Sequence, residues 1–242
     1  MRIHRVHTHH SLQPDCEVII RDKQAHYLTR VLRVVAGQRV LLFNGDGYDY
    51  VAEVLRPGKK ELYLEVVSRL PAVKEPELEI MVVQAISKGD RMDQTLQKCT
   101  ELGVTVFQPL FSGRVEVRLK AEKLASRLEH WRAVVTSACE QSGRAVVPAV
   151  LAPLSLAEWI NMPGQGQRLV LAPGAGMPLS RVQFGHSLQL AVGPEGGFSE
   201  IELGLMKSHE VRPVSLGPRI LRTETAAPAG VAVIQALAGD FS

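Results

Sequence analysis

Two glycine-bearing turns late in the chain limit the possible folds most, because each stands where a strand should end and a helix should begin. The first turn has the sequence Gly-Pro-Glu-Gly-Gly at 193–197 and follows the apolar run 188–192. The second covers 215–226 and leads into a nearly all-apolar helix. Such turns are typical of open α/β sheets, in which ligands bind at the carboxyl ends of the strands. The two turns together predict a cofactor site.

The chain from residue 77 onward alternates apolar strands with helices. We expect strands at 79–84, 105–110, 168–171, 188–192 and 211–215, and helices at 88–102, 122–141, 199–208 and 224–238. Alternation of this kind favours a mostly parallel sheet that is covered by helices on both faces. The fold class is therefore α/β.

The chain before this point has the pattern of a small β-rich unit. Short strands are expected at 2–6 and 17–20, a helix at 24–34, and a three-stranded meander at 39–43, 48–55 and 61–68. Asn44-Gly45-Asp46-Gly47 predicts a hairpin between the first two strands of the meander, because Asn-Gly and Asp-Gly accept the positive φ of such turns. The prolines in 70–76 predict a linker. Two domains follow, at 1–72 and 73–242.

The basic excess of the chain lies entirely in its first domain. The net charge of the 242 residues is +3, and 11 Lys and Arg stand against 8 Asp and Glu in residues 1–72. A basic surface suggests contact with a polyanion, since Lys and Arg gain affinity by releasing the counterions of phosphates. The excess taken alone favours the simpler explanation, an ordinary solvated surface.

Composition also argues against a metal site and a membrane location. The three cysteines, Cys16, Cys99 and Cys139, are far apart and lack metal-ligand spacing, so we expect no metal. No run of about 18 apolar residues exists, and the N-terminus lacks the apolar core of a signal peptide. We expect a cytoplasmic protein that makes no contact with membranes.

The first glycine turn leaves its backbone free for a ligand. Ser199 and Glu202 form a capping box, which fixes the start of the next helix and leaves the glycines just outside it. Glycines there let N–H and C=O groups approach a flat ring or a carboxylate, which a Cβ would prevent. A simple tight turn needs one glycine, so three favour a ligand over a turn alone.

The class of ligand follows by elimination. The sequence contains no GxxxxGK[ST] motif for a nucleoside triphosphate, and no GxGxxG after its first strand for a dinucleotide. A ligand held by 171–174, 193–197 and 216–221 would meet mainly backbone and apolar groups. Such a pocket suits an adenosine that carries no phosphate.

Further motifs extend this reading over nearly the whole chain. They are HYLTRVLR at 26–33, QKCTELGV at 97–104, ACEQSGR at 138–144 and LRTETA at 221–226. Together with the glycine turn at 193–197, they resemble the SPOUT superfamily of methyltransferases, and most closely the 16S rRNA uracil-N3 methyltransferase family.

This resemblance implies a small PUA-like β-barrel that binds RNA, followed by a SPOUT domain with a parallel sheet and a trefoil knot. It further implies S-adenosylmethionine as cofactor, a homodimer with the active site near the subunit interface, and 16S rRNA as partner, within the small ribosomal subunit or a late assembly particle. The cofactor residues it implies are Leu171, Pro173, Gly193, Pro194, Gly196, Gly197, Leu216, Gly217, Ile220, Leu221, Thr225 and Ala226.

The implied reaction requires alignment of the methyl donor with uracil N3 and removal of the weakly acidic N3 proton. We expect Arg222, Glu195 and Glu224 to be the catalytic residues, as a base or as a cation beside the deprotonated ring. Ion pairing explains Arg222 equally well, and a favourable position at the start of a helix explains Glu224. Cys139 fits a small buried apolar residue better than a nucleophile.

Contacts with RNA are expected from basic and polar residues in both parts of the chain. The expected residues are Arg2, Arg5, Arg30, Arg33, Arg114, Glu140, Gln141 and Arg144. Two other functions fit the same motifs: a SPOUT methyltransferase with another RNA target or acceptor atom, and a ribosome-assembly factor that binds RNA without catalysis. The three glycines of the turn speak against the second, because an unused pocket gives no reason to keep them.

Overall fold

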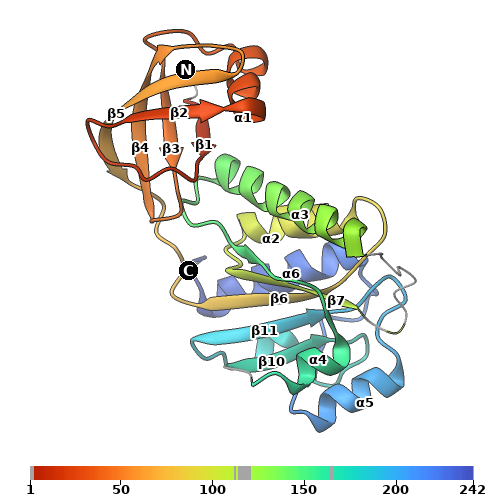
Figure 1. Ribbon diagram of the computed structural model, residues 1–242. Coiled ribbons are helices and arrows are strands. Elements are labelled where there is room, and N and C mark those ends of the chain that lie inside the picture. Colours follow the sequence, from red (N-terminus) through yellow and green to blue (C-terminus); the bar gives the residue numbers. More distant parts are fainter. Residues whose placement is uncertain (1–2, 112, 114–120, 164–165, 242) are drawn as a thin grey trace. The chain divides into compact units, whose positions relative to one another are not determined.

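The computed structural model describes residues 3–111, 113, 121–163 and 166–241, which form two compact units (Figure 1). The first unit contains the chain up to Glu75 together with Cys139–Val147, and the second contains Pro76–Ala138 and the chain from Pro148 onward. The sequence places a single division after residue 72. The structure places the first crossing after Glu75 and returns a later segment to the first unit.

The first unit is a curled five-stranded sheet in the order β1-β3-β4-β5-β2. Its strands are β1 Arg5–His7, β2 Glu17–Arg21, β3 Arg39–Phe43, β4 Tyr48–Arg56 and β5 Glu61–Pro71. The antiparallel pairs β3–β4 and β4–β5 confirm the meander. Pairing of β5 with β4 continues to Pro71, into the stretch expected to be a linker. Proline is tolerated there because β2 pairs only with Glu61–Glu65, which leaves the end of β5 as an edge.

The hairpin between β3 and β4 forms at the expected tetrapeptide. Gly45 and Gly47 have φ values of 95° and 87°, in the region that favours glycine. The backbone N–H of Asp46 donates to the side-chain oxygen of Asn44 at 3.2 Å, and the hydroxyl of Tyr50 donates to the Asp46 carboxylate at 2.7 Å. The turn is therefore held by its own side chains.

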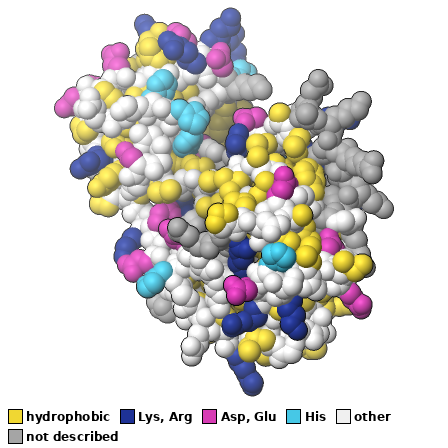
Figure 2. All heavy atoms as spheres, turned by 60° about the horizontal axis from the view of Figure 1, so that its bottom comes forward, with side chains coloured by type: hydrophobic (Ala, Val, Ile, Leu, Met, Phe, Trp, Pro, Cys, Tyr) yellow, Lys and Arg dark blue, Asp and Glu magenta, His cyan; other side chains and the backbone are white. Residues whose placement is uncertain are grey.

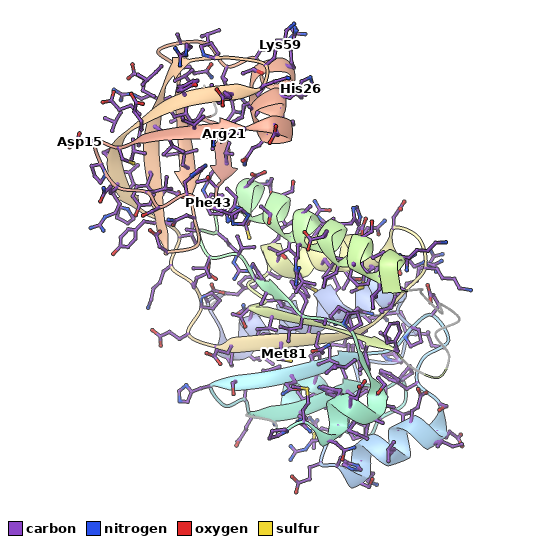
Figure 3. All side chains as sticks on the ribbon, viewed as in Figure 1. Asp15, Arg21, His26, Phe43, Lys59 and Met81 are labelled. Carbon is purple, nitrogen blue, oxygen red and sulfur yellow. The ribbon has the colours of Figure 1, made fainter. Side chains whose placement is uncertain are left out.

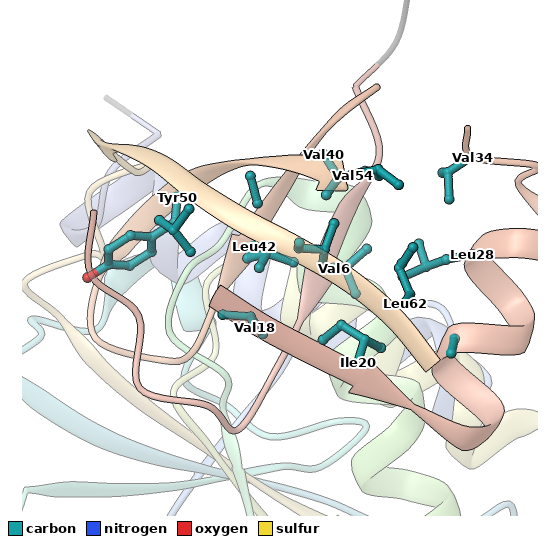
Figure 4. Packing of buried hydrophobic residues seen from close by; sticks show 14 of the residues in the cluster. Val6, Val18, Ile20, Leu28, Val34, Val40, Leu42, Tyr50, Val54 and Leu62 are labelled. Carbon is teal, nitrogen blue, oxygen red and sulfur yellow. The ribbon is translucent and has the colours of Figure 1, made fainter. Parts of the chain in front are cut away.

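The core of the first unit is built from alternate residues of these strands. Along β4, Tyr50, Ala52 and Val54 are buried while their neighbours are more exposed. They pack with side chains from the other strands and with Leu28 (Figure 4). Burying one large apolar side chain contributes about 1.5–3 kcal/mol, so this cluster stabilises the curled sheet.

The helical segment after β2 differs from the expected helix at 24–34. It consists of a short α-helix, α1 Asp22–His26, and a π-helical turn, η1 Tyr27–Val31. The wider turn is closed by the N–H of Leu32, which donates to the carbonyl of Tyr27 at 3.1 Å. Ala25 and Leu28 are fully buried against the sheet, whereas Tyr27 and Val31 in the π-helical turn are exposed.

The second unit is an α/β layer structure, which confirms the expected fold class. Its sheet has the order β12-β10-β11-β6-β7-β8, and all strand pairs among the described residues of this unit are parallel. Helices α2 and α6 lie on one face and α4 and α5 on the other (Figure 1). The strands are β6 Glu79–Ala85, β7 Val106–Phe111, β8 Ala149–Val150, β9 Leu154–Ser155, β10 Gln167–Leu171, β11 Ser187–Val192 and β12 Arg212–Val214. The helices are α2 Arg91–Glu101, α3 Ala121–Ser142, α4 Leu156–Asn161, the 3-10 helix η2 Leu179–Arg181, α5 Glu200–Ser208 and α6 Thr223–Ala238.

Four of these elements were not expected from the sequence, namely β8, β9, α4 and η2. All are short, so no periodic pattern marks them. For α4 a signal existed, because Ser155 and Glu158 form a capping box at its start. No helix among the described residues is long and apolar enough to cross a membrane. The trefoil knot stays a prediction of the resemblance.

Candidate cofactor site

A pocket of about 510 Å³ lies at the carboxyl ends of β10, β11 and β12, where the two glycine-bearing turns meet. Every residue expected to bind the cofactor lines it except Thr225, which is exposed in the first turn of α6. Segments that lie more than 20 residues apart in the chain therefore share one site, as the open α/β sheet requires. Contact of these residues with a cofactor stays a prediction.

The backbone of the glycine turn forms one wall of the pocket. A Cβ on Gly193 would lie 3.1 Å from both the Cα of Gly197 and the backbone nitrogen of Phe198, so this position has no room for a side chain. The capping box is present: the N–H of Glu202 donates to the Ser199 hydroxyl at 3.2 Å, and the N–H of Ser199 donates to the Glu202 carboxylate at 2.7 Å. This box fixes α5 and leaves the turn facing the pocket.

The other walls are largely apolar. Leu171, Val192 and Leu216 come from three strand ends, while Ile220 lies at the pocket with 84% of its surface exposed. Such walls favour a flat apolar ring, and the free backbone groups of the turns favour its polar edge. Pocket residues that lie outside the segments expected to hold the ligand, and that were given no role, are Val192, Phe198, Glu200, Leu203, Val214 and Thr223.

Arg91, the first residue of α2, pairs with two acidic side chains beside the pocket. Its Nη1 lies 2.5 Å from Oε1 of Glu195, and its Nε lies 3.8 Å from Oε2 of Glu224. Burial alone would raise the pKa of Glu195, but backbone N–H groups of Glu195 and Lys88 and the Arg91 guanidinium outweigh it and lower the pKa. Glu195 is therefore held as a carboxylate. No local motif marks Arg91, because its partners lie far away along the chain.

The expected catalytic residues occupy different places. Glu195 lines the pocket, whereas Arg222 and Glu224 stand at the start of α6 beside it. The Arg222 side chain is 81% exposed and its Nη1 lies 4.0 Å from Oε1 of Glu224. The Glu224 side chain is only 14% exposed, and its Oε2 has no hydrogen-bond partner among the described residues.

Several residues expected to contact RNA are engaged inside the first unit. Arg5 pairs with Asp49 at 2.7 Å, with side-chain exposures of 8% and 13%, and donates to the carbonyl of Cys139 at 2.6 Å. Arg144 is buried and pairs with Glu75. These pairs fix the segment Cys139–Val147 on the sheet, which gives both arginines a structural role.

Glu140 and Cys139 share this environment. The Glu140 carboxylate accepts the backbone N–H of His7 at 3.0 Å, and burial raises the pKa of Glu140. Burial also raises the pKa of the Cys139 thiol to about 11, so it is protonated at neutral pH and poorly suited to act as a nucleophile.

The remaining residues expected to contact RNA are exposed or undescribed. Gln141, Arg30 and Arg33 are exposed. Neither Arg30 nor Arg33 pairs with an acidic side chain within the described part of the chain. Arg2 and Arg114 lie outside the described residues.

Comparison with known proteins agrees with this architecture. Residues 74–235 match the model of a family described as RNA methyltransferase domain, and residues 20–67 match one described as RNA methyltransferase PUA domain. A Synechocystis protein named ribosomal RNA small subunit methyltransferase E is 35% identical over 92% of this chain and 74% of its own length. One from Buchnera aphidicola (Schizaphis graminum), with the same name, is 30% identical over 100% and 99%.

Two solved structures resemble the chain over its whole length. A Neisseria gonorrhoeae ribosomal RNA small subunit methyltransferase E bound to S-adenosylmethionine has a TM-score of 0.92 and 37% identity, with 100% of each chain covered. A methyltransferase from Legionella pneumophila, also with bound cofactor, has a TM-score of 0.93 and 35% identity at the same coverage. The matched domains, the relatives and the shared architecture together show that this chain belongs to the RNA methyltransferase family that contains ribosomal RNA small subunit methyltransferase E.

Proposed function

We propose that the protein methylates N3 of a specific uridine in 16S rRNA, with S-adenosylmethionine as the methyl donor. The observation that carries this proposal is the pocket formed by the two glycine-bearing turns, in a chain whose relatives bind this cofactor. When bound, the cofactor supplies a methyl group on a positively charged sulfur. The residues of the chain must bind the donor and the uridine, align the methyl group with uracil N3, and stabilise the charge that develops on the ring.

The pocket fits this donor by shape and chemistry. A volume of about 510 Å³ lies in the usual range for sites that hold small molecules. Gly193 lets the turn close tightly, because a Cβ there would press on the backbone of Gly197 and Phe198, and Leu171, Val192 and Leu216 offer apolar surface to a ring. The donor needs no phosphate cradle, and the sequence contains none of the usual ones.

The acidic and basic side chains beside the pocket have different roles in removing the N3 proton of the uracil. Oε1 of Glu195 is engaged by Arg91 and by the backbone N–H of Lys88, and the pKa of Glu195 is lowered, so it is a poor proton acceptor. Glu224 has an oxygen without a hydrogen-bond partner among the described residues, which makes it the better base of the two. Arg222 is exposed and has room to turn toward the negative charge that develops on the uracil.

RNA contact is assigned to one end of the first unit, which we call the basic end: Arg21, Arg30, Arg33, Arg56, Lys59 and Lys60. The N–H of Asp22 donates to the carbonyl of Lys60 at 2.9 Å, so the turn between β4 and β5 adjoins the start of α1. Figure 3 shows Lys59 and His26 at this same end. Neither Lys59 nor Lys60 pairs with a carboxylate among the residues described, which leaves both available for phosphates.

Tyr27 adds an aromatic surface to this region. Its ring is 48% exposed and adjoins Arg30 on the same short helical segment. Exposed aromatic rings beside cations suit unstacked bases of single-stranded RNA. Acidic and basic side chains are otherwise interspersed on the surface (Figure 2), so recognition depends on such a local group and not on the overall charge.

The partners and location complete the proposal. We assign the protein to the cytoplasm, with the small ribosomal subunit or a late assembly particle as substrate. A homodimer is supported by exposed apolar side chains at the C-terminal end of the chain, where Leu237 and Phe241 are each 52% exposed. Contact of this end with a second copy would bury apolar surface that is otherwise in water.

Nucleoside mass spectrometry of small-subunit rRNA tests the reaction directly. RNA from cells that lack the protein should contain no 3-methyluridine at the target, and purified protein with S-adenosylmethionine should restore it. Comparison of naked RNA with isolated small subunits identifies the substrate form. Unchanged 3-methyluridine in the deletion strain would refute the uracil-N3 assignment, and a different methylated nucleoside would name the acceptor in its place.

A further inference from the structure

A chain of hydrogen bonds behind the pocket ties three of its segments together. The side-chain amide of Gln84, near the end of β6, donates to the hydroxyl of Thr223 at 2.9 Å. The Thr223 hydroxyl in turn donates to the carbonyl of Gly193 at 2.9 Å. Gln84 is completely buried and Thr223 is 4% exposed, so water does not compete for these bonds.

The direction of this chain is fixed by the chemistry of its members. A hydroxyl has a single proton, and because Thr223 accepts from the Gln84 amide, that proton is left for the Gly193 carbonyl. The first residue of the glycine turn and the first residue of α6 are thereby held against each other. No side chain caps the start of α6, since Arg222 at the N-cap position makes no such bond.

We propose that Gln84 is a positioning residue of the cofactor pocket, which acts through Thr223 to hold the glycine turn in its binding conformation. Gln84 itself is not among the residues that line the pocket, whereas Thr223 and Gly193 are. This inference rests on the proposed function for the identity of the ligand, S-adenosylmethionine, but not for the geometry of the turn.

The buried side chain of Gln84 lowers the free energy of unfolding, so stability alone does not explain a glutamine at this position. Its Oε1 is buried and has no hydrogen-bond partner among the described residues. An apolar side chain of similar length would avoid that unsatisfied group. What the glutamine supplies in place of an apolar side chain is its amide donor, which bonds to Thr223 at the pocket.

The neighbouring strand supplies a matched control. Gln108 of β7 is 2% exposed, and its amide donates to the carbonyls of Pro109 at 2.9 Å and Ala152 at 2.8 Å. Gln84 likewise donates to the carbonyl of the residue that follows it, Ala85, at 2.9 Å. The two side chains thus share burial and local bonding, but only Gln84 reaches a residue that lines the pocket.

The test compares Gln84→Met and Thr223→Val with Gln108→Met and Thr223→Ser. Calorimetry should show about tenfold weaker binding of S-adenosylmethionine for Gln84→Met and Thr223→Val, and near wild-type binding for Thr223→Ser, which keeps the hydroxyl. The double variant Gln84→Met/Thr223→Val should lose little more than either single variant, because both break one chain. Gln84→Met should retain or raise the Tm, whereas a purely structural glutamine would lower it.

Hydrogen exchange in the free protein separates this inference from the identity of the ligand. In Gln84→Met the amides of residues 193–198 should exchange faster than in the wild type, while Gln108→Met leaves them unchanged. Faster exchange without any binding of S-adenosylmethionine by the wild type would refute the proposed cofactor and keep the positioning role. Unchanged exchange, or equal affinity in Gln84→Met and the wild type, would overturn the positioning role and leave the cofactor proposal intact.

Discussion

At the scale of single residues, the charges around the pocket depend on Arg91. Replacement by methionine leaves Glu195 and Glu224 without their shared cation. We expect Arg91→Met to lower kcat by about 10- to 100-fold, since groups that set charge at a reacting centre contribute on that order. The pKa of Glu195 should rise, which carbon NMR of labelled glutamate measures directly.

The control for this experiment lies on the same helix. Lys98 pairs with Glu101 at 3.1 Å and takes no part in the pocket. Lys98→Met should leave kcat and the Glu195 titration unchanged. If Arg91→Met raised only KM for the cofactor, with kcat intact, the role of Arg91 would be binding and not charge control.

A second residue-scale prediction concerns Glu140 and pH. Burial raises the folded-state pKa of Glu140 above its ordinary value of 4.5. At pH values between the unfolded-state and folded-state pKa, the folded protein therefore binds more protons than the unfolded chain. Stability is therefore lost as Glu140 ionises, and Glu140→Gln should raise the Tm at pH 7 by about 1–3 °C. The gain should vanish as pH falls below 4.5, where both states are protonated. A lower Tm for the variant at pH 7 would contradict this account.

The residues that sequence reasoning placed correctly at the pocket are those in the two glycine-bearing turns, where each motif is local. Arg91, Gln84 and Thr223 were not assigned roles, since Arg91 lies 104 positions from Glu195, and Gln84 lies 139 positions from Thr223. Arg5 and Arg144 show the converse limit. The sequence alone does not distinguish an arginine that is buried in an ion pair from one that is exposed and free to bind RNA.

At the scale of elements, the basic end makes a prediction about RNA affinity. Lys59→Glu/Lys60→Glu should weaken binding of a 16S rRNA fragment and reduce the slope of log affinity against log salt by about 1.5, because two phosphate contacts are lost. Affinity for S-adenosylmethionine should not change, since the pocket lies in the other unit.

A variant with the same change of charge in the second unit provides the comparison. Lys98→Glu/Lys207→Glu alters net charge equally, but on helices α2 and α5. It should leave the salt slope close to that of the wild type. Equal slopes for both double variants would mean that overall charge governs the affinity, and the basic end would lose its assignment.

Long elements were predictable and short or irregular ones were not. The strands of both sheets other than β8 and β9, and helices α2, α3, α5 and α6, follow from apolar periodicity, with ends displaced by a few residues. The π-helical turn at Tyr27–Val31 escaped because a helix-spaced pattern does not distinguish a wider turn from a regular one. As a result the exposure of Tyr27, on which its proposed contact with RNA depends, could not be predicted.

At the scale of the whole molecule, the cofactor should stabilise the two units unequally. All pocket residues belong to the second unit, so a ligand at 100 times its Kd should add about 2.7 kcal/mol to the stability of that unit alone. Hydrogen exchange with S-adenosylmethionine present should slow in the second unit and stay unchanged in the first. Equal slowing in both units would show that they unfold together, and no slowing anywhere would argue against the cofactor.

The return of Cys139–Val147 to the first unit has a consequence for biosynthesis. Phe43 is buried with Cys139 and Ala145, and Arg5 donates to the Cys139 carbonyl. Until the nascent chain includes this segment, those groups have no cover, so the first unit is complete only after the whole of α3 has been translated. The first unit therefore cannot finish folding until the ribosome has synthesised a segment that lies almost twice as far along the chain as β5.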